Sequence, residues 1–273
     1  SEWDKYSQKT YAANFGEVSH GDITQISEKD IPKFDVLLAG FPCQPFSTIG
    51  KRQGFSHPTQ GTLFHDVARI MRMKRNRAFL LENVVGLKNH DNGRTLNIIE
   101  ETLTDLGYSY DYKVLDAADF GVPQHRSRIY IVGFKSRKSG RTQFDWPTGK
   151  KAHVGIGKFI QTGVKDHSIS KHLQKVYMFK KDDGRPQIVD CSSDEPAKTL
   201  VATYHKIQRL TGTFVRDGET GLRLLTADEC KAIMGFPKKF KIPVSRTQMY
   251  RQMGNSVAVP VVTELAKFIQ KEL

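Results

Sequence analysis

The chain has 273 residues, of which 38% are hydrophobic and 26% charged, as in an ordinary soluble protein with one large domain or two moderate ones. No apolar run approaches membrane-spanning length, and the start at Ser1 does not resemble a signal peptide, so we expect no membrane or secreted protein. The three cysteines, Cys43, Cys191 and Cys230, are widely spaced and form no CxxC pair, which argues against disulfides or zinc. We therefore expect a cytoplasmic protein without a metal site.

The formal net charge is +13 and the isoelectric point is near 9.6, which favours a polyanionic partner. The excess is uneven, because residues 135–183 contain twelve Lys and Arg against four Asp. A basic face that serves only solubility is the alternative interpretation.

Helices and buried strands alternate along the first 135 residues. Asp4 is expected to cap a helix that runs to about Asn14 and stops at Gly16. Further on, the spacing of apolar residues predicts helices at 63–74 and 95–106 and strands at 35–39, 78–81, 108–115 and 128–134. Strands separated by helices of this length predict an α/β fold with a largely parallel sheet.

The pattern changes after Phe134. Residues 135–222 lack a sustained helical period, and order returns with a capping box at Thr226–Glu229 and an amphipathic helix at 260–273. We predict two domains: a catalytic domain of residues 1–135 plus 243–273, and a smaller domain of residues 136–242.

Polar groups lie where several predicted strands begin or end. Cys43 follows the strand at 35–39 on a loop stiffened by Pro42 and Pro45, and Glu82 ends the next strand. Arg126 and Arg128 lead into a later strand.

Taken one at a time, these residues have ordinary explanations, namely a buried thiol, a strand-end carboxylate and surface charges. Together they are suited to activating a heteroaromatic ring. A thiolate adds to an electron-poor carbon, a carboxyl group donates a proton to a ring nitrogen, and a guanidinium stabilises the anion.

Five ordered motifs carry a resemblance to a known family. They are Phe41-Pro-Cys-Gln44, Glu82-Asn-Val84, Gln124-x-Arg-x-Arg128, Arg223-x-Leu-Thr226 with Gly235-Phe-Pro237, and Gly254-Asn-Ser-Val257. The chain resembles the cytosine-5 DNA methyltransferases of bacterial restriction–modification systems, from Ser1 to about Phe134 and from about Arg223 to the end. The resemblance implies a Rossmann-like, S-adenosylmethionine-dependent methyltransferase α/β fold with a mixed, mostly parallel sheet. It also implies a mainly β/loop target-recognition domain at 136–242.

The resemblance implies roles for individual residues. Cys43 would attack carbon 6 of a cytosine, which must be flipped out of double-stranded DNA because that carbon is inaccessible inside a stacked duplex. Glu82 would contact the ring nitrogen N3 and the exocyclic amine, Arg128 would hold O2, and Arg126 would support Cys43 and the pocket. The carbonyl of Phe41 would accept from the exocyclic amine.

Binding residues follow in the same way. S-adenosylmethionine would be held by Glu2, Trp3, Asp22, Ile23, Asn255 and Val257. The loop at 47–61 matches the family's mobile active-site loop, and the further substrate or DNA contacts would be Gln44, Ser47, Lys51, Arg52 and Thr199. The DNA sequence that is read does not follow from these motifs.

One expected motif is missing from the sequence. The family begins with a strand and a Phe-x-Gly-x-Gly turn that cradles the methionine part of the cofactor, whereas here Glu2 already belongs to the next motif. Truncation, permutation, or a second polypeptide that supplies the motif are the alternatives. Without that strand we expect weak cofactor binding. A DNA-binding subunit with vestigial chemistry and a transfer-RNA methyltransferase are the alternative functions.

Overall fold

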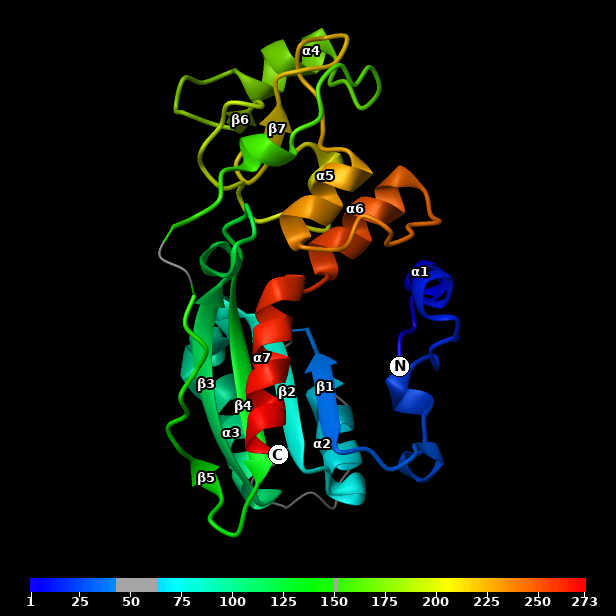
Figure 1. Cartoon of the computed structure of the whole chain (residues 1–273), viewed down its shortest axis with the longest axis vertical. Helices are drawn as coiled ribbons and strands as arrows, with labels where there is room; N and C mark the ends of the chain where they lie inside the picture. The colour runs from blue at the N-terminus through cyan, green and yellow to red at the C-terminus, as the bar shows by residue number, and fades with distance from the viewer. Residues whose placement is uncertain (43–62, 150–151) are drawn as a thin grey trace.

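The computed structural model describes residues 1–42, 63–149 and 152–273. Two units are stacked along the long axis of the molecule (Figure 1). We call the described residues 33–149 and 257–273 the lower unit, residues 152–255 the upper unit, and residues 1–31 the N-terminal arm. The predicted loop at 47–61 lies outside the described residues.

A five-stranded mixed sheet forms the centre of the lower unit, in the order β1-β2-β4-β3-β5. β1 pairs in parallel with β2, whereas β4 runs antiparallel to both β2 and β3. The strands are β1 Val36–Gly40, β2 Ala78–Val84, β3 Tyr108–Asp116, β4 Ser127–Lys135 and β5 Gly140–Arg141.

The direction of β4 sets it apart from the other strands. The expected mixed, mostly parallel sheet is confirmed, because β1, β2, β3 and β5 run in one direction and β4 alone of these five is reversed, which makes the two longest ladders antiparallel. As a result β4 starts at the edge of the sheet where β2 ends, and Val84 pairs with Arg128.

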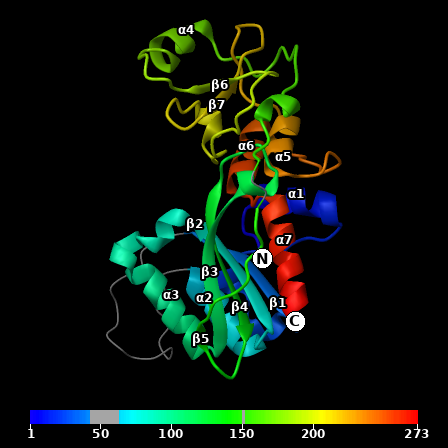
Figure 2. The ribbon, with the colours of Figure 1, turned by 60° about the vertical axis from the view of Figure 1, so that its left-hand side comes forward.

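Helices cover both faces of this sheet. α2 (Leu63–Lys74) and α3 (Arg94–Asp105) lie on one face, and α7 (Val259–Glu272) lies on the other (Figures 1 and 2). Alternate residues of β2 face the two layers: Phe79 and Leu81 pack with the core of α2 and α3, whereas Ala78 and Leu80 pack with the core of α7. The predicted helices at 63–74 and 95–106 are thus confirmed.

The N-terminal arm contains the predicted helix, α1 (Lys5–Phe15). Asp4 accepts hydrogen bonds from two amides of its first turn, and Gly16 ends it in the left-handed conformation at φ 76°. The helix lies apart from the sheet (Figure 1) and is joined to the upper unit, where Asn14 Nδ2 donates to the carbonyl of Lys241 at 2.8 Å.

The upper unit consists of short elements joined by loops. Its helices are α4 (Lys171–Leu173), α5 (Ala227–Met234) and α6 (Arg246–Asn255), and its strands are β6 (Gln187–Val189) and β7 (Thr213–Val215).

Short 3-10 or π turns across the chain are η1 Ile23–Gln25, η2 Glu28–Asp30, η3 Val85–Lys88, η4 His90–Gly93, η5 Ala117–Phe120, η6 Ile156–Phe159, η7 Gln174–Met178 and η8 Tyr204–Lys206.

A buried arginine holds the upper unit together. Arg223 has no exposed surface, and its Nη1 donates to Glu229 Oε2 at 2.8 Å while its Nε donates to Asp217 Oδ2 at 3.0 Å. Glu229 also closes the predicted capping box on Thr226, which is therefore confirmed.

The core clusters of the two units extend past residues 136 and 242, and the predicted domain boundaries stay a prediction. Trp146 belongs to the core beneath α7, so the chain after β4 stays with the lower unit. Met249 and Met253 of α6 belong to the core of the upper unit. The role of the upper unit in target recognition stays a prediction.

Within the ranges that the structure describes, no helix is long and apolar enough to cross a membrane.

The buried ion pairs of Arg223 give a prediction about stability. Arg223→Met should lower the free energy of unfolding by about 3–5 kcal/mol, because it leaves the Glu229 carboxylate buried without its partner. Urea titration followed by circular dichroism measures this, with the exposed Arg216→Met as the matched control, expected within about 0.5 kcal/mol of wild type. Equal stability of the two variants would contradict this assignment.

Candidate active site

Glu82 and Arg128 form an ion pair where β2 ends and β4 begins. Arg128 Nε lies 3.1 Å from Glu82 Oε1, and the two side chains are only 15% and 18% exposed. Glu82 pairs with Tyr130 across the ladder, and Arg128 lies two residues earlier on the same face. The site therefore requires β4 to be antiparallel to β2, since in a parallel pair Arg128 would lie at the opposite edge.

The strand that leads to Cys43 lies beside this pair. Gly40, the last residue of β1, is the cross-strand partner of Glu82. A Cβ atom at Gly40 would be 3.5 Å from Glu82 Oε2, so the glycine brings backbone close to the carboxylate. Cys43 lies outside the described residues, as do Gln44, Ser47, Lys51 and Arg52, and their roles stay predictions.

Phe41 follows Gly40 and is held against the end of β2. Its carbonyl accepts a hydrogen bond from Asn83 Nδ2 at 2.9 Å, and its ring packs on Phe64 with centroids 5.4 Å apart. A carbonyl oxygen has two lone pairs, so the Phe41 carbonyl has room for a second hydrogen bond beside that of Asn83. Its contact with an exocyclic amine stays a prediction. The sequence analysis predicted no role for Asn83. Its hydrogen bond holds the backbone in place directly after β1.

Burial raises the pKa of Glu82, and the nearby charges of Arg128 and Arg126 offset only part of this effect. A carboxyl group of this kind keeps its proton to higher pH than an exposed one. It is therefore suited to donating a proton or a hydrogen bond to a ring nitrogen.

Arg126 connects the ion pair to the rest of the molecule. Its side chain is 3% exposed, and Nη1 donates to the carbonyl of Leu200 at 3.0 Å. Nη2 donates to the carbonyls of Gly254 and Ser256 at 3.0 and 2.7 Å. Burial and the charge of Arg128 lower the pKa of Arg126 to about 10, which still leaves it protonated at neutral pH.

Gln124 is a residue whose role the sequence did not predict. It is fully buried, its Oε1 accepts from the amide of Leu200 at 2.6 Å, and its Nε2 donates to the carbonyl of Ile233 at 2.9 Å. It therefore joins the start of β4 to two segments of the upper unit. Its place in the Gln124–Arg128 motif was the available signal.

The N-terminal arm brings two predicted cofactor segments together. The amide of Glu2 donates to the carbonyl of His20 at 2.7 Å, and Ser1 Oγ donates to that of Gly21, so Trp3 and Asp22 belong to adjacent segments. Trp3 is 79% exposed. Beyond them, Ile23 is half-buried and its carbonyl accepts a hydrogen bond from Arg69 of α2.

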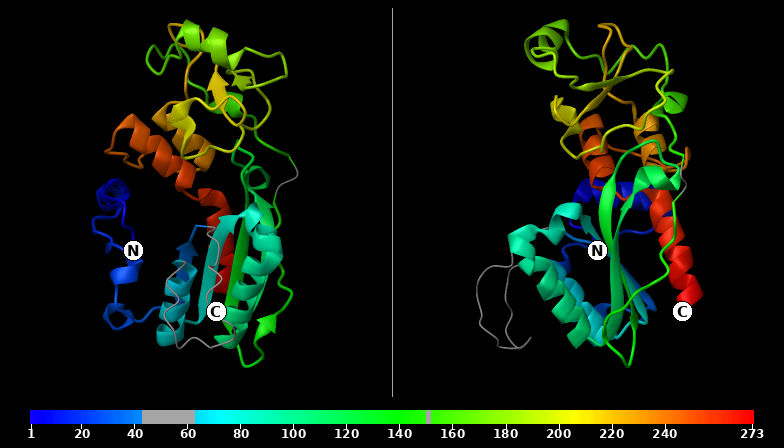
Figure 3. Two further views of the ribbon diagram at one scale, coloured as in Figure 1. Left: turned by 180° about the vertical axis from the view of Figure 1, so that it is seen from behind. Right: turned by 90° about the vertical axis from the view of Figure 1, so that its left-hand side faces the viewer.

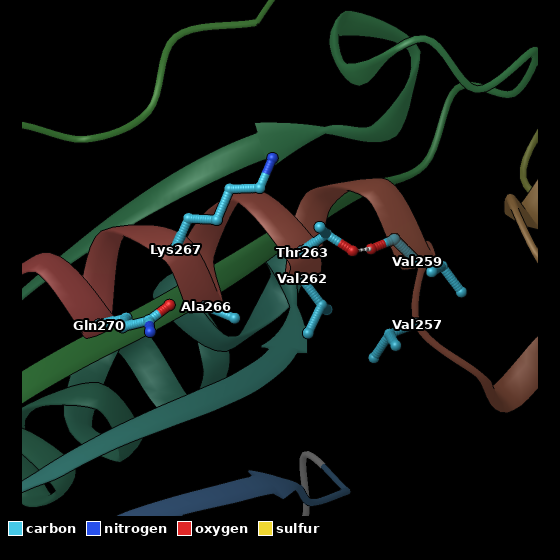
Figure 4. Close-up of a pocket in the computed structure, with 7 residues that line it drawn as sticks. All are labelled: Val257, Val259, Val262, Thr263, Ala266, Lys267 and Gln270. Atoms are coloured by element: carbon cyan, nitrogen blue, oxygen red, sulfur yellow. Dashed lines mark hydrogen bonds between the residues drawn. The ribbon is translucent and has the colours of Figure 1, made fainter.

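The third predicted cofactor segment follows α6. Asn255 is exposed at the end of that helix, and Val257 borders an open groove of about 400 Å³ along α7 (Figure 4). The groove is lined by Val257, Val259, Val262, Thr263, Ala266, Lys267 and Gln270.

Thr199 lies at the junction of the two units. Its hydroxyl donates to the carbonyl of His125 at 2.6 Å, so its only hydroxyl proton is used within the protein. The predicted phosphate contact of Thr199 stays a prediction.

Comparison with known proteins decides the family. Residues 1–271 match the family model of the C-5 cytosine-specific DNA methylases. The chain belongs to this family. The type II methyltransferase M.MspI of Moraxella sp. is 58% identical over 273 residues, covering 100% of this chain and 65% of that protein. M.BsuFI of Bacillus subtilis is 57% identical over 274 residues, with 100% and 66% covered.

The chain thus spans just under two thirds of the length of these two relatives. In each relative the matched region and the remaining third belong to one polypeptide, so the comparison gives no support to the alternative of a second polypeptide.

Solved structures confirm the fold. The Dnmt2 methyltransferase of S. pombe superposes with a TM-score of 0.78 at 21% identity, covering 99% of this chain and 90% of that one. A DNMT2 mutant of Spodoptera frugiperda superposes with a TM-score of 0.76 at 24% identity, with 98% and 90% covered.

The raised pKa of Glu82 predicts a pH dependence. A carboxyl group whose pKa is higher folded than unfolded stabilises the fold below the unfolded value, about 4.3, and this contribution is lost as pH rises through the folded pKa. The free energy of unfolding of wild type should therefore fall relative to that of Glu82→Gln as the pH rises from 4 to neutral. Urea titrations of both proteins at pH 4 and at neutral pH measure this difference. A gain relative to Glu82→Gln would mean that the ion pair with Arg128 outweighs burial.

Proposed function

We propose that the protein transfers a methyl group from S-adenosylmethionine to carbon 5 of cytosine in a specific double-stranded DNA sequence, as the modification enzyme of a restriction–modification system. The observation that carries this proposal is the buried Glu82–Arg128 pair beside the strand that leads to Cys43. Membership of the C-5 cytosine-specific DNA methylase family supports it. A cytoplasmic location is part of the proposal.

The first chemical step belongs to Cys43 and Glu82. The Cys43 thiolate forms a bond to carbon 6 of a flipped-out cytosine, the π electron pair of the C5–C6 bond shifts to C4–C5, and that of the C4–N3 bond moves onto N3. Glu82 gives a proton or hydrogen bond to N3, which its raised pKa favours. Carbon 5 becomes nucleophilic, while Arg128 holds O2 and Arg126 keeps Arg128 and Glu82 in place.

The residues present are suited to part of S-adenosylmethionine. Trp3 offers an exposed indole face to an adenine, Glu2 a carboxylate to ribose hydroxyls, and Val257 an apolar groove wall. Asp22, Ile23 and Asn255 complete the proposed set. When bound, S-adenosylmethionine supplies an electrophilic methyl group.

The last step releases Cys43 from the methylated base. A base removes the proton from carbon 5, the electron pair re-forms the C5–C6 double bond, the bond between Cys43 and carbon 6 breaks, and any proton placed on N3 returns to Glu82. Cys43 leaves as a thiolate, ready for another turnover.

Duplex DNA is the proposed partner. The high positive charge of the chain suits the phosphate backbone, and many of its lysines are exposed on the upper unit. Gln44, Ser47, Lys51, Arg52 and Thr199 are proposed to contact the substrate or its phosphates, and the carbonyl of Phe41 the exocyclic amine.

Trapping on DNA that carries 5-fluorocytosine tests the function. Release of the product requires a base to remove a proton from carbon 5, and fluorine in its place cannot be removed in this way, so the covalent adduct persists. With S-adenosylmethionine present, wild type should form a covalent adduct that survives denaturation. Cys43→Ser should form none, and the exposed Cys191→Ser, as the matched control, should form it normally.

Glu82→Gln should slow methyl transfer to unmodified DNA by about 10²–10⁴-fold, because the proton donor is lost. An adduct that persists in Cys43→Ser would remove Cys43 from the mechanism. Specific duplex binding without any transfer would instead favour the vestigial DNA-binding subunit.

A further inference from the structure

The N-terminal arm has little apolar packing of its own, since Thr10 is the only buried residue among residues 1–31. Its helix α1 is joined to the upper unit, where Thr10 Oγ1 donates to Gln252 Oε1 at 2.9 Å. The amide of Lys241 donates to Asn14 Oδ1 at 2.8 Å. The other end of the arm, with the turns η1 and η2, lies beside the cyan helix α2 of the lower unit (Figure 3, left). The position of this end therefore depends on polar contacts with α2.

One arginine of α2 makes these contacts. Arg69 Nη2 donates to the carbonyl of Ile23 at 2.5 Å, and its Nη1 donates to the carbonyl of Ile26 at 2.9 Å. Nη1 also lies 3.2 Å from Glu28 Oε1, while Nε donates to Asp66 Oδ1 of the same helix at 2.9 Å. Within the described residues, the hydrogen bonds that join the arm to the lower unit are those of Arg69. Its planar fork of donors thus clamps η1 onto α2.

The clamped turn carries residues proposed to bind the cofactor. Asp22 precedes η1, and its Oδ1 accepts from the amide of Thr24 at 2.9 Å, so the turn sets the orientation of this carboxylate. The amide of Glu2 donates to the carbonyl of His20 at 2.7 Å, which connects Glu2 and Trp3 to the same segment. Holding η1 in place therefore also determines where these residues lie.

The same helix contacts the strand that leads to Cys43. Phe64 of α2 is fully buried and packs on the ring of Phe41 with centroids 5.4 Å apart. Arg69 follows Phe64 by five residues, or about 7.5 Å along the helix axis. One rigid helix therefore sets the spacing between the arm and the end of β1.

We propose that Arg69 is a positioning residue for S-adenosylmethionine and acts through the η1 turn. By clamping η1 onto α2, it keeps Asp22 and Ile23 in the arrangement that binds the cofactor and at a fixed spacing from the residues that hold the cytosine. This inference rests on the proposed function. Spacing matters because a misplacement of about 1 Å between two reactants can slow a reaction by about 10²-fold.

A reaction that needs no cofactor separates this role from a general effect on the protein. Once Cys43 has added to carbon 6, carbon 5 can take a proton from water and then lose its original hydrogen as Cys43 leaves. Tritium at carbon 5 is thereby released into water without any methyl transfer. This exchange uses Cys43 and Glu82 but not the cofactor residues of the arm.

The test compares both reactions on a pool of duplexes with randomised base pairs around one cytosine tritiated at carbon 5. Arg69→Met should lower kcat/KM for S-adenosylmethionine by about 10- to 100-fold, because two hydrogen bonds from a charged group are lost. Tritium release without cofactor should stay at the wild-type rate. The dissociation constant of S-adenosylmethionine, measured by calorimetry, should rise.

Two further variants serve as controls. Lys29→Met removes an exposed cation from η2 and should match wild type in both reactions. Arg69→Lys keeps a cation beside Glu28 and Asp66, but a single ammonium cannot reproduce the fork that reaches both carbonyls. It should therefore recover only part of the lost kcat/KM.

An unchanged kcat/KM in Arg69→Met would overturn the inference. Equal falls in methyl transfer and tritium release, in a variant that circular dichroism shows to be folded, would also overturn it and assign Arg69 to the integrity of the whole protein. Full recovery in Arg69→Lys would contradict the clamp on the two carbonyls. A wild-type protein that neither releases tritium nor transfers a methyl group would instead contradict the proposed function.

Discussion

The antiparallel pairing of β4 with β2 determines where the residues of the candidate site lie. It brings the start of one strand to the end of the other, so that Arg128 meets Glu82 at 3.1 Å. The same reversal places Gln124 and Arg126, which precede β4, at the junction of the two units. One change of strand direction therefore creates both the ion pair and the connection to the upper unit.

That connection consists of buried hydrogen bonds. Arg126 and Gln124 donate to four backbone carbonyls and accept one amide between them, across Leu200, Ile233, Gly254 and Ser256. Buried polar groups are costly unless they are satisfied, so these contacts hold only one relative arrangement of the chain segments. In the proposed enzyme, this rigidity would keep the upper unit in register with the reacting carbon.

Much of this could be predicted from the sequence, where the signal is local. Periodicity correctly predicted β1, β2, α2 and α3, and the capping residue of α1 was visible in Asp4. The direction of β4 could not be predicted, because an apolar run has the same pattern whichever way the strand points. The partners of Gln124 are 76 and 109 residues away, which no local pattern encodes.

In the proposed mechanism, Glu82 and Arg128 act as one unit on the cytosine ring. A double-mutant cycle on the rate of methyl transfer tests it, with Glu82→Gln, Arg128→Met and the double variant. Groups that act together lose most of their effect when either is removed, so the double variant should be little slower than the slower single variant. Losses that multiply as for independent residues would contradict the claim.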